Sequence, residues 1–473
     1  MPEQEDFDLV VVGGGPGGYA AALRAAGAGL SVALVEQDRV GGTCLHRGCI
    51  PAKELLEAAH VWQTVQTASA FGINFNEAPS MDFAANQGRK REVIEMLFKG
   101  LSGLLDKRSV SIFGGRGQLT GSHEVTVTAD GTEVAKLKGR YIILASGSRP
   151  RTLGSLVIDG KVVVTSDEFL EIERLPKSAA VIGAGAIGCE FASLLSDLGV
   201  KVSLIESLDR LLAGCDKDIS ATVARSFKKR KISILTGTQV TGHELLADGT
   251  GAHLNFSEGD GIDVELVVVS VGREACTSGL VADGLAIVLD PAGAIAVDEF
   301  QQTAIPDVYA VGDVVAGSPQ LAHVGFAEAL VAVGRILGEE VEPVNYERVP
   351  WAIYCQPEVA FAGLSEEEAV DRGIAVVVSK DTFMGNGRAR IIGHTDGLVK
   401  IVAQANSDGS AGQVLGVHLC GPWVTEQLSG GYFAVNWEAS ATQLAGLIQP
   451  HPSLSESFGE AALALVGRGL HLA

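Results

Sequence analysis

The sequence has no long apolar run, few cysteines and few cations. No stretch approaches the ~18 consecutive apolar residues of a membrane span, so we expect no membrane segment and no membrane partner. The acidic start MPEQED is unlike a secretory signal, and seven cysteines in 473 residues are too few for a disulfide framework. Both features favour a reducing, cytoplasmic location. Lys and Arg number 36 against 57 Asp and Glu, a net charge of −21, which argues against a nucleic-acid partner.

Apolar residues and glycine are abundant. Hydrophobic residues make up 47% of the chain, which is enough for large cores, and the length suggests about three domains. The 59 glycines follow no Gly-x-y period, so they are expected at tight turns and at close approaches of the backbone.

The same order of elements occurs twice along the chain. An apolar strand at residues 7–12, a glycine-rich turn and an Ala-rich helix lead to a second strand that ends at Glu36. Residues 178–206 repeat this order and end at Glu206. The first glycine of each turn precedes the acid by 23 residues, from 13 to 36 and from 183 to 206. We therefore predict two βαβ units of the same design.

Each unit carries the pattern G-x-G-x-x-G, formed by Gly13, Gly15 and Gly18 and by Gly183, Gly185 and Gly188. These glycines allow the strand-to-helix turn, the approach of a pyrophosphate and close helix–strand packing. Two packing turns are the alternative, but the acids in register argue against it. Glu206 at the second site favours the free ribose 2′-hydroxyl of NAD over the 2′-phosphate of NADP.

Residues 308–315, VYAVGDVV, form a short apolar strand that is expected to break at Gly312. The break can direct the Asp313 carboxylate to a sugar or ribityl hydroxyl. Taken alone, an Asp at a strand end is common, so its meaning depends on the other motifs.

Residues 41–53, GGTCLHRGCIPAK, place Cys44 and Cys49 just before a helical pattern. A helix start and a nearby cation favour the nucleophilic thiolate form of cysteine. Metal ligation is the competing chemistry, but no second Cys/His pair has a usual zinc spacing, so no metal is expected. The other cysteines are interpreted as small buried hydrophobic residues: Cys189, Cys215, Cys276, Cys355 and Cys420.

Near the C-terminus, PHPSLSE offers His451 and, five residues later, Glu456 at the start of a helical pattern. A carboxylate that orients a histidine makes a general base near neutral pH. A purely structural His–Glu pair is the alternative.

With these motifs in order, the chain resembles the pyridine nucleotide–disulfide oxidoreductases, most closely their dihydrolipoamide dehydrogenase branch. The resemblance covers about residues 7–465 and rests on GGTCLHRGCIPAK, VYAVGDV and HPSLSE, together with the glycine turns. It implies an α/β fold with two Rossmann-like domains, for FAD and NAD, a central domain and a C-terminal α+β dimerisation domain. The implied boundaries are 1–150 for FAD, 151–275 for NAD, 276–345 for the central domain and 346–473 for the interface domain.

The resemblance also implies roles for residues. Cys49 would face the flavin, Cys44 would exchange with the substrate dithiol, and His451 from a partner subunit, oriented by Glu456, would be the base. Lys53 and Glu190 would pair near the flavin ring. FAD would be held by Gly13, Gly15, Gly18, Glu36, Gly42, Thr43, Gly117, Ser146, Gly147, Ser148 and Asp313, alongside Leu321, Ala322 and His323. NAD would be held by Gly183, Gly185, Gly188, Glu206, Val240, Gly272 and Arg273.

The implied activity is oxidation of dihydrolipoyl groups by NAD⁺ in a homodimer that serves a lipoyl carrier or an acyltransferase subunit. Two departures from the branch pattern concern the substrate: Gln449 replaces an extra histidine, and Cys355-Gln356 replaces a Thr-containing dipeptide. The alternatives are an NAD(P)H-dependent reductase of another small disulfide, a flavoprotein of the NADH oxidase or diaphorase type, and an assembly component docked on an acyltransferase core.

Overall fold

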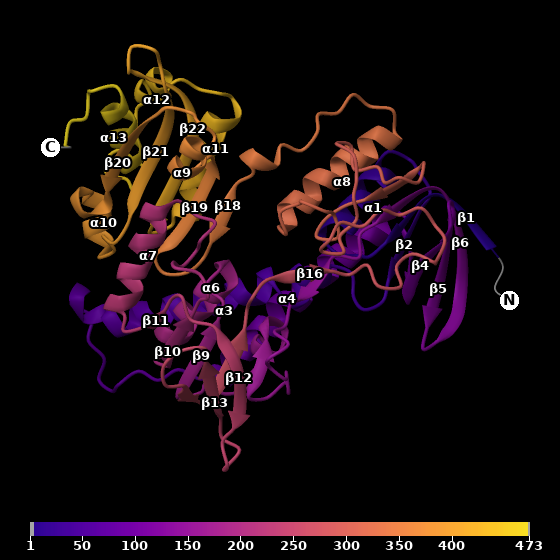
Figure 1. The fold of residues 1–473 in the computed structure, drawn as a ribbon, viewed down its shortest axis with the longest axis horizontal. Helices are drawn as coiled ribbons and strands as arrows, with labels where there is room; N and C mark the ends of the chain where they lie inside the picture. The colour runs from indigo at the N-terminus through magenta and orange to yellow at the C-terminus, as the bar shows by residue number, and fades with distance from the viewer. Residues whose placement is uncertain (1–3, 472–473) are drawn as a thin grey trace. The chain divides into compact units, whose positions relative to one another are not determined.

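The computed structural model describes residues 4–471, which form two compact units (Figure 1). The first unit contains the chain up to Leu55, Asp82–Arg151 and Gly272–Tyr346. The second contains Leu56–Met81, Thr152–Val271 and the chain from Glu347 onward. The finer division into four domains stays a prediction.

The first unit is built on a seven-stranded sheet around β1 (Gln4–Val12). Its order is β3-β2-β1-β6-β5-β4, and β17 pairs with β6; β1 runs parallel to β2 and β6. Leu9–Val12 is at most 4% exposed, as expected for an apolar strand in the middle of a covered parallel sheet. The other strands are β2 (Val32–Glu36), β3 (Ser111–Gly114), β4 (Arg116–Gly121), β5 (Glu124–Ala129), β6 (Thr132–Leu144) and β17 (Val308–Ala310).

Helices α1 (Pro16–Gly27) and α8 (Ala322–Ile336) pack against each other beside this sheet (Figure 1). A Cβ built on Gly325 of α8 would lie 3.4 Å from the Gly17 nitrogen of α1, so the two backbones approach closely. Further helices are α2 (Gly42–His46), α3 (Cys49–Thr67) and α4 (Phe83–Lys107), and β7 (Ser148–Pro150) pairs with β16 (Arg273–Ala275).

The second unit contains the predicted second βαβ element. A parallel sheet has the order β11-β10-β9-β15-β8, and β9 (Ser178–Ile182), α6 (Ala186–Asp197) and β10 (Lys201–Ile205) repeat the design of β1, α1 and β2. This confirms two Rossmann-like units. The remaining elements here are β8 (Val163–Thr165), α5 (Ser166–Phe169), α7 (Lys217–Lys229), β11 (Ser233–Leu235), β15 (Leu266–Val269), and an antiparallel sheet of β12 (Val240–Leu245), β13 (Ala252–Phe256) and β14 (Ile262–Val264).

The C-terminal part of this unit is an antiparallel sheet in the order β18-β19-β22-β21-β20, packed by helices (Figure 1). Its strands are β18 (Trp351–Ile353), β19 (Glu358–Gly363), β20 (Val376–Thr382), β21 (Leu398–Ala405) and β22 (Ala411–Gly421). Its helices are α9 (Glu366–Asp371), α10 (Gly387–Ile392), α11 (Val424–Asn436), α12 (Ala441–Ala445) and α13 (Glu456–Leu465). This arrangement is the expected α+β domain.

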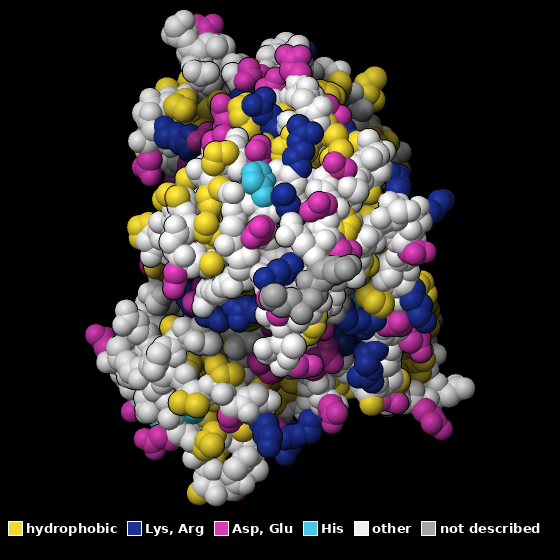
Figure 2. Space-filling model, turned by 90° about the vertical axis from the view of Figure 1, so that its right-hand side faces the viewer, with side chains coloured by type: hydrophobic (Ala, Val, Ile, Leu, Met, Phe, Trp, Pro, Cys, Tyr) yellow, Lys and Arg dark blue, Asp and Glu magenta, His cyan; other side chains and the backbone are white. Residues whose placement is uncertain are grey.

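Within residues 4–471, no helix combines the length and the apolarity that a membrane crossing requires. On the face shown in Figure 2, Lys and Arg side chains are interspersed with Asp and Glu side chains. Mixed charges of this kind are typical of a solvated surface.

Candidate active site and cofactor sites

The first glycine turn joins β1 to α1 and leaves open space at the start of the helix. Gly13 has φ +107°, and a Cβ there would lie 2.2 Å from the Ala145 oxygen. A Cβ on Gly18 would lie 1.8 Å from the Gly13 oxygen, so the start of α1 packs directly against the backbone that follows β1. A Cβ on Gly15, the residue that caps α1, would meet nothing within 4 Å. This space at a helix N-terminus fits the pyrophosphate of a dinucleotide.

The middle residue of this turn, Gly14, is held on both sides. Its N–H donates to Glu36 Oε2 at 2.7 Å, and its carbonyl accepts from the Gly41 N–H at 2.8 Å. Gly42, with φ +57°, packs so closely that a Cβ there would lie 2.6 Å from the Gly15 Cα. The glycine pair that opens the cysteine motif is therefore part of the predicted FAD turn, and neighbouring Thr43 follows it in α2.

The second turn has the same geometry. Gly183 has φ +95°, a Cβ on Gly188 would lie 1.8 Å from the Gly183 oxygen, and a Cβ on Gly185 would meet nothing within 4 Å. The N–H of Ala184 donates to Glu206 Oε2 at 2.7 Å, matching the Gly14–Glu36 bond. The residues of this turn fit a second dinucleotide.

Asp313 lies in a hydrogen-bonded group at the end of β17. Its Oδ2 accepts from Ser148 Oγ at 2.5 Å, and Ser148 Oγ accepts from Arg273 Nε at 2.7 Å. The backbone of Gly147, with φ +70°, accepts from the Cys276 N–H at 2.9 Å. Serines of the predicted FAD turn and Asp313 thus lie together, and their role in holding FAD stays a prediction.

Arg273 lies in this group, 3.9 Å from Asp313. Gly272, with φ +106°, belongs to the same compact unit as Arg273, whereas Val240 begins β12 in the second unit. The assignment of Gly272, Arg273 and Val240 to NAD stays a prediction.

The sequence analysis missed Glu328, a fully buried residue of α8. Its carboxylate accepts from the Gly312 N–H at 2.5 Å, Ser318 Oγ at 2.5 Å and Tyr346 Oη at 2.7 Å. Burial raises the pKa of Glu328 against the opposing effect of these bonds. Glu328 fixes the turn that presents Asp313; a lone acid in the apolar helix segment VGFAEAL was the available signal.

The other predicted FAD residues occupy defined positions in the first unit. Ser146 Oγ donates to the Cys276 oxygen at 2.8 Å. Gly117 lies in β4, where a Cβ would meet Val12 Cγ1 at 2.8 Å, so close packing requires a glycine there. Leu321 caps α8, and Ala322 and the exposed His323 are its first residues. Their contacts with FAD stay predictions.

The thiols of Cys44 and Cys49 are half-buried and joined by a hydrogen bond. Cys44 lies in α2, and Cys49 is the first residue of α3, as the helical pattern predicted. This bond, burial and the Cys49 charge raise the pKa of the Cys44 thiol well above its ordinary value, and Lys53 opposes them. Tyr19 of α1, which the sequence analysis also missed, has a pKa raised to about 12 by burial and by the two thiols.

Four of the five other cysteines are buried, as predicted, and Cys276 is half-buried. Burial raises the pKa of each of these thiols. Cys355 Sγ donates to the Pro357 oxygen at 3.2 Å. The half-buried His46 ring bonds the Val40 oxygen at 2.9 Å.

His451 and Glu456 form the predicted pair. His451 Nδ1 lies 2.7 Å from Glu456 Oε1, and Glu456 Oε2 accepts from the Ser453 N–H at 2.8 Å. The imidazole is 80% exposed, whereas the carboxylate is only 28% exposed. Burial raises the pKa of Glu456, but the bonds from His451 and Ser453 outweigh it, so the net pKa is lowered. Gln449, one of the departures, packs against α13, close to Gly459.

Glu190 lies in α6, 4% exposed, and its Oε1 accepts from the Tyr354 N–H at 2.9 Å. Lys53 lies in α3, in the first compact unit, whereas Glu190 lies in the second. Their pairing therefore stays a prediction.

Comparison with known proteins assigns these motifs to one family. The family model described as pyridine nucleotide-disulphide oxidoreductase matches residues 7–329, and the model of its dimerisation domain matches residues 349–462. The chain belongs to this family. The resemblance found from the sequence motifs is thereby confirmed, and the protein is a flavoprotein oxidoreductase of a family that uses FAD and NAD.

Curated relatives match over the whole chain. The chain is 40% identical to a dihydrolipoyl dehydrogenase of Bacillus subtilis over 98% of this chain and 99% of that protein. It is 41% identical to a dihydrolipoyl dehydrogenase of Zymomonas mobilis over 99% of both. The crystal structure of LpdA from Mycobacterium tuberculosis is similar, with a TM-score of 0.89 and 26% identity, covering 98% of this chain and 100% of that one.

Proposed function

We propose that the protein oxidises dihydrolipoyl groups and reduces NAD⁺. The hydrogen-bonded thiols of Cys44 and Cys49, held beside the first glycine turn by Gly41 and Gly42, carry this proposal. The full-length similarity to dihydrolipoyl dehydrogenases supports the choice of substrate. Glu206 supports NAD rather than NADP, because its carboxylate stands where a 2′-phosphate would be repelled.

The thiol exchange begins with the Cys44–Cys49 pair as a disulfide. His451 takes the proton of a substrate thiol, and the resulting thiolate attacks the sulfur of Cys44 and releases Cys49 as thiolate. His451 gives its proton to the sulfur of Cys44 as Cys44 leaves and takes the proton of the second substrate thiol, whose sulfur displaces Cys44. This step closes the lipoyl disulfide and leaves Cys44 as a thiol, Cys49 as a thiolate and His451 protonated.

Glu456 orients the imidazole through Nδ1, which leaves Nε2 to accept the substrate proton. We place His451 opposite the thiols of the partner subunit in a homodimer, for which the dimerisation domain offers support. FAD held at the first glycine turn would supply the two-electron redox chemistry that links the enzyme dithiol to NAD⁺. Lys53 and Glu190 pair near the flavin ring in this proposal.

The lipoyl group is carried by another protein, a carrier or acyltransferase subunit of a 2-oxoacid dehydrogenase complex or of a glycine cleavage system. We place the reaction in the cytoplasm, because seven cysteines in 473 residues are too few for a disulfide framework.

The deciding experiment measures NADH formation from NAD⁺ and dihydrolipoamide by the purified, flavin-loaded protein. Reduced glutathione in place of dihydrolipoamide is the control substrate. Rapid NADH formation with dihydrolipoamide alone is the expected result. A flavin-loaded protein that does not oxidise dihydrolipoamide but oxidises another dithiol or thiol would contradict the substrate assignment.

The variant His451→Gln tests the base. Because each thiol exchange needs a proton removed, turnover should fall roughly 10²–10⁴-fold. His471→Gln is a matched control, since His471 Nδ1 lies 3.1 Å from Glu460 and its ring is 81% exposed. Equal turnover of the two variants would contradict the role of His451.

A further inference from the structure

The segment between β10 and α7 lies against the second glycine turn. Leu212, in the left-handed region with φ +47°, donates its N–H to the Ala184 oxygen at 2.9 Å. Ala184 is therefore held by Glu206 on its N–H and by Leu212 on its carbonyl, just as Gly14 is held by Glu36 and Gly41. In the first turn, the N–H that bonds the Gly14 carbonyl comes from Gly41 of the cysteine motif. In the second turn, the N–H that bonds the Ala184 carbonyl comes from Leu212, in a segment without such a motif, so other contacts must hold this segment in place.

Part of that support comes from the dimerisation domain. Arg210 Nη1 donates to Glu367 Oε1 of α9 at 2.7 Å, and Arg210 Nη2 donates to the Ala213 oxygen at 3.0 Å. Glu367 Oε2 accepts from the Lys217 N–H at 3.0 Å. The Glu367 carboxylate of the dimerisation domain thus accepts hydrogen bonds from residues on both sides of Leu212.

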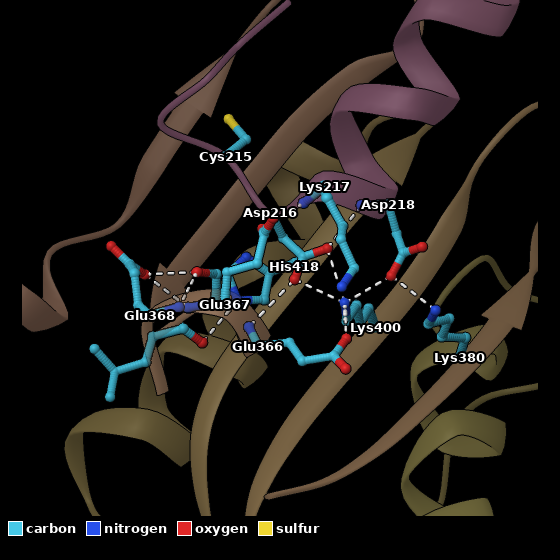
Figure 3. Close-up of polar contacts among 12 residues, drawn as sticks. Cys215, Asp216, Lys217, Asp218, Glu366, Glu367, Glu368, Lys380, Lys400 and His418 are labelled. Carbon is cyan, nitrogen blue, oxygen red and sulfur yellow. Dashed lines mark hydrogen bonds and ion pairs between the residues drawn. The ribbon is translucent and has the colours of Figure 1, made fainter. Parts of the chain in front are cut away.

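The far end of the segment is anchored by a buried ion cluster (Figure 3). Asp216 caps α7 and, like Lys400 of β21, has a fully buried side chain. Lys400 Nζ lies 2.7 Å from Asp216, 2.6 Å from Asp218 and 2.7 Å from Glu366 of α9. The carboxylate oxygens are close enough to surround a metal ion, but the ammonium of Lys400 already lies among them. The cluster fastens α7 to the dimerisation domain.

We propose that the dimerisation domain positions the NAD-binding turn. Glu367 and the Lys400 cluster act as positioning residues: they fix residues 207–216, and Leu212 transmits this order to the Ala184 peptide. The Ala184 peptide lies between Gly183, which packs against Ser270, and Gly185, which opens onto the expected pyrophosphate site, so its orientation sets the backbone that NAD meets. Ordering the turn before binding lowers the entropy lost when NAD binds. This inference rests on the proposed function and extends it to the control of NAD affinity.

The test compares Glu367→Ala with Asp396→Ala in the flavin-loaded protein. Asp396 forms an ion pair with Lys229 at 2.5 Å, which joins the dimerisation domain to the opposite end of α7. Both variants therefore remove one ion pair between the same two parts of the second unit. The readouts are kcat, KM for NAD⁺ and for dihydrolipoamide, and the Kd of NAD⁺ from calorimetry.

Glu367→Ala should raise KM and Kd for NAD⁺ roughly 3–10-fold, with kcat and KM for dihydrolipoamide changed less than about 2-fold. Asp396→Ala should leave all four values within about 2-fold. An unchanged Kd for NAD⁺ in Glu367→Ala, or an equal change in both variants, would overturn the inference. The calorimetric titration needs no dihydrolipoamide. A wild-type protein that binds NAD⁺ but does not oxidise dihydrolipoamide would therefore contradict the proposed function and leave the inference on NAD⁺ affinity testable.

A double-mutant cycle tests whether Arg210 and Glu367 affect NAD⁺ binding through their shared ion pair. Arg210→Ala and Glu367→Ala should each weaken NAD⁺ binding, and the double variant should bind NAD⁺ no more weakly than the worse single variant. Glu367→Gln keeps an acceptor oxygen and should show a smaller change than Glu367→Ala. If the losses of NAD⁺ affinity in the two single variants add fully in the double variant, the two residues do not act through their ion pair, and the inference is contradicted.

Discussion

Lys400→Met removes the one cation at the centre of the buried cluster and keeps most of the side-chain volume. Asp216 then becomes a fully buried carboxylate without its cation, whereas Asp218 and Glu366 are 26% and 29% exposed and retain some hydration. Loss of one partner from a buried ion pair destabilises a protein by about 3–5 kcal/mol. We expect the lower part of this range, because Asp216 still accepts the Asp218 N–H at 2.9 Å.

Urea unfolding followed by tryptophan fluorescence measures this loss locally. All four tryptophans, Trp62, Trp351, Trp423 and Trp437, belong to the second compact unit, so their fluorescence reports on the unit that contains the cluster. Flavin fluorescence reports on the first unit. Lys380→Met is the control, since Lys380 contacts Asp218 at 2.7 Å but is 44% exposed, and exposed pairs contribute about 0–1 kcal/mol.

The pH dependence gives a second signature. Burial raises the pKa of Asp216, but the bond and charge of Lys400, His418 and the Asp218 N–H together outweigh it and lower the net pKa below 3.8. Burial lowers the pKa of Lys400, but its three carboxylates raise it from 10.5 to about 12. A lowered acid pKa stabilises the fold above 3.8 and loses this effect as the pH falls. A raised lysine pKa stabilises the fold fully below 10.5 and loses this effect as the pH rises through about 12. The cluster therefore stabilises the native state between these limits.

In Lys400→Met the pKa of Asp216 should rise, so protonation relieves the buried charge and the stability deficit shrinks as the pH is lowered from about 7 to 5. A variant as stable as the wild type at pH 7, or a deficit that stays constant over this range, would refute the reasoning. Asp216→Asn/Lys400→Met removes both charges and should be closer to the wild type than Lys400→Met.

Three further results are expected. Gly42→Ala puts a Cβ 2.6 Å from backbone at φ +57°, so flavin occupancy, read from the absorbance ratio of flavin to protein, should fall, whereas Gly100→Ala meets nothing within 4 Å and should keep it. Cys49→Ser should abolish dihydrolipoamide oxidation while flavin stays bound, and loss of the flavin would indicate a structural role instead. Glu456→Gln replaces the charged partner of His451 by a neutral acceptor, so kcat/KM for dihydrolipoamide should fall about 3–10-fold, and an unchanged value would contradict the orienting role.

The sequence predicted the parts of the site that depend on local geometry. A glycine turn between a strand and a helix, two thiols at a helix start and a His–Glu pair five residues apart are each determined within about 25 residues. The second βαβ unit could be recognised as a repeat of the first for the same reason, because its glycine turn and its acid also lie within a short stretch of sequence.

The contacts that hold these motifs were not predictable in this way. Lys400 and Asp216 are 184 residues apart, and Lys400 lies in a strand segment, LVKIVAQA, whose pattern gives no sign that its cation is buried. Leu212 acts through its backbone N–H, which its side-chain type does not reveal. The Glu328 carboxylate is a lone acid in an apolar helix segment, but the sequence does not show that its partner is the Gly312 N–H. Arg273 was assigned from the resemblance, whereas its bond to Ser148 depends on the pairing of β7 with β16. Tertiary structure decides such contacts.

With NAD bound as proposed, the bond between Glu206 and the second glycine turn links coenzyme choice to local folding. A change from NAD to NADP preference has to remove the carboxylate of Glu206, because its charge repels a 2′-phosphate. The same carboxylate accepts the N–H groups of Ala184 and Leu208, at 2.7 and 2.9 Å. A substitution such as Glu206→Arg would leave both donors without their acceptor, each at a cost of about 1 kcal/mol. An engineered or natural switch of coenzyme in this scaffold therefore needs a second change that supplies a new acceptor for the turn, and single substitutions at this position are poor starting points for one.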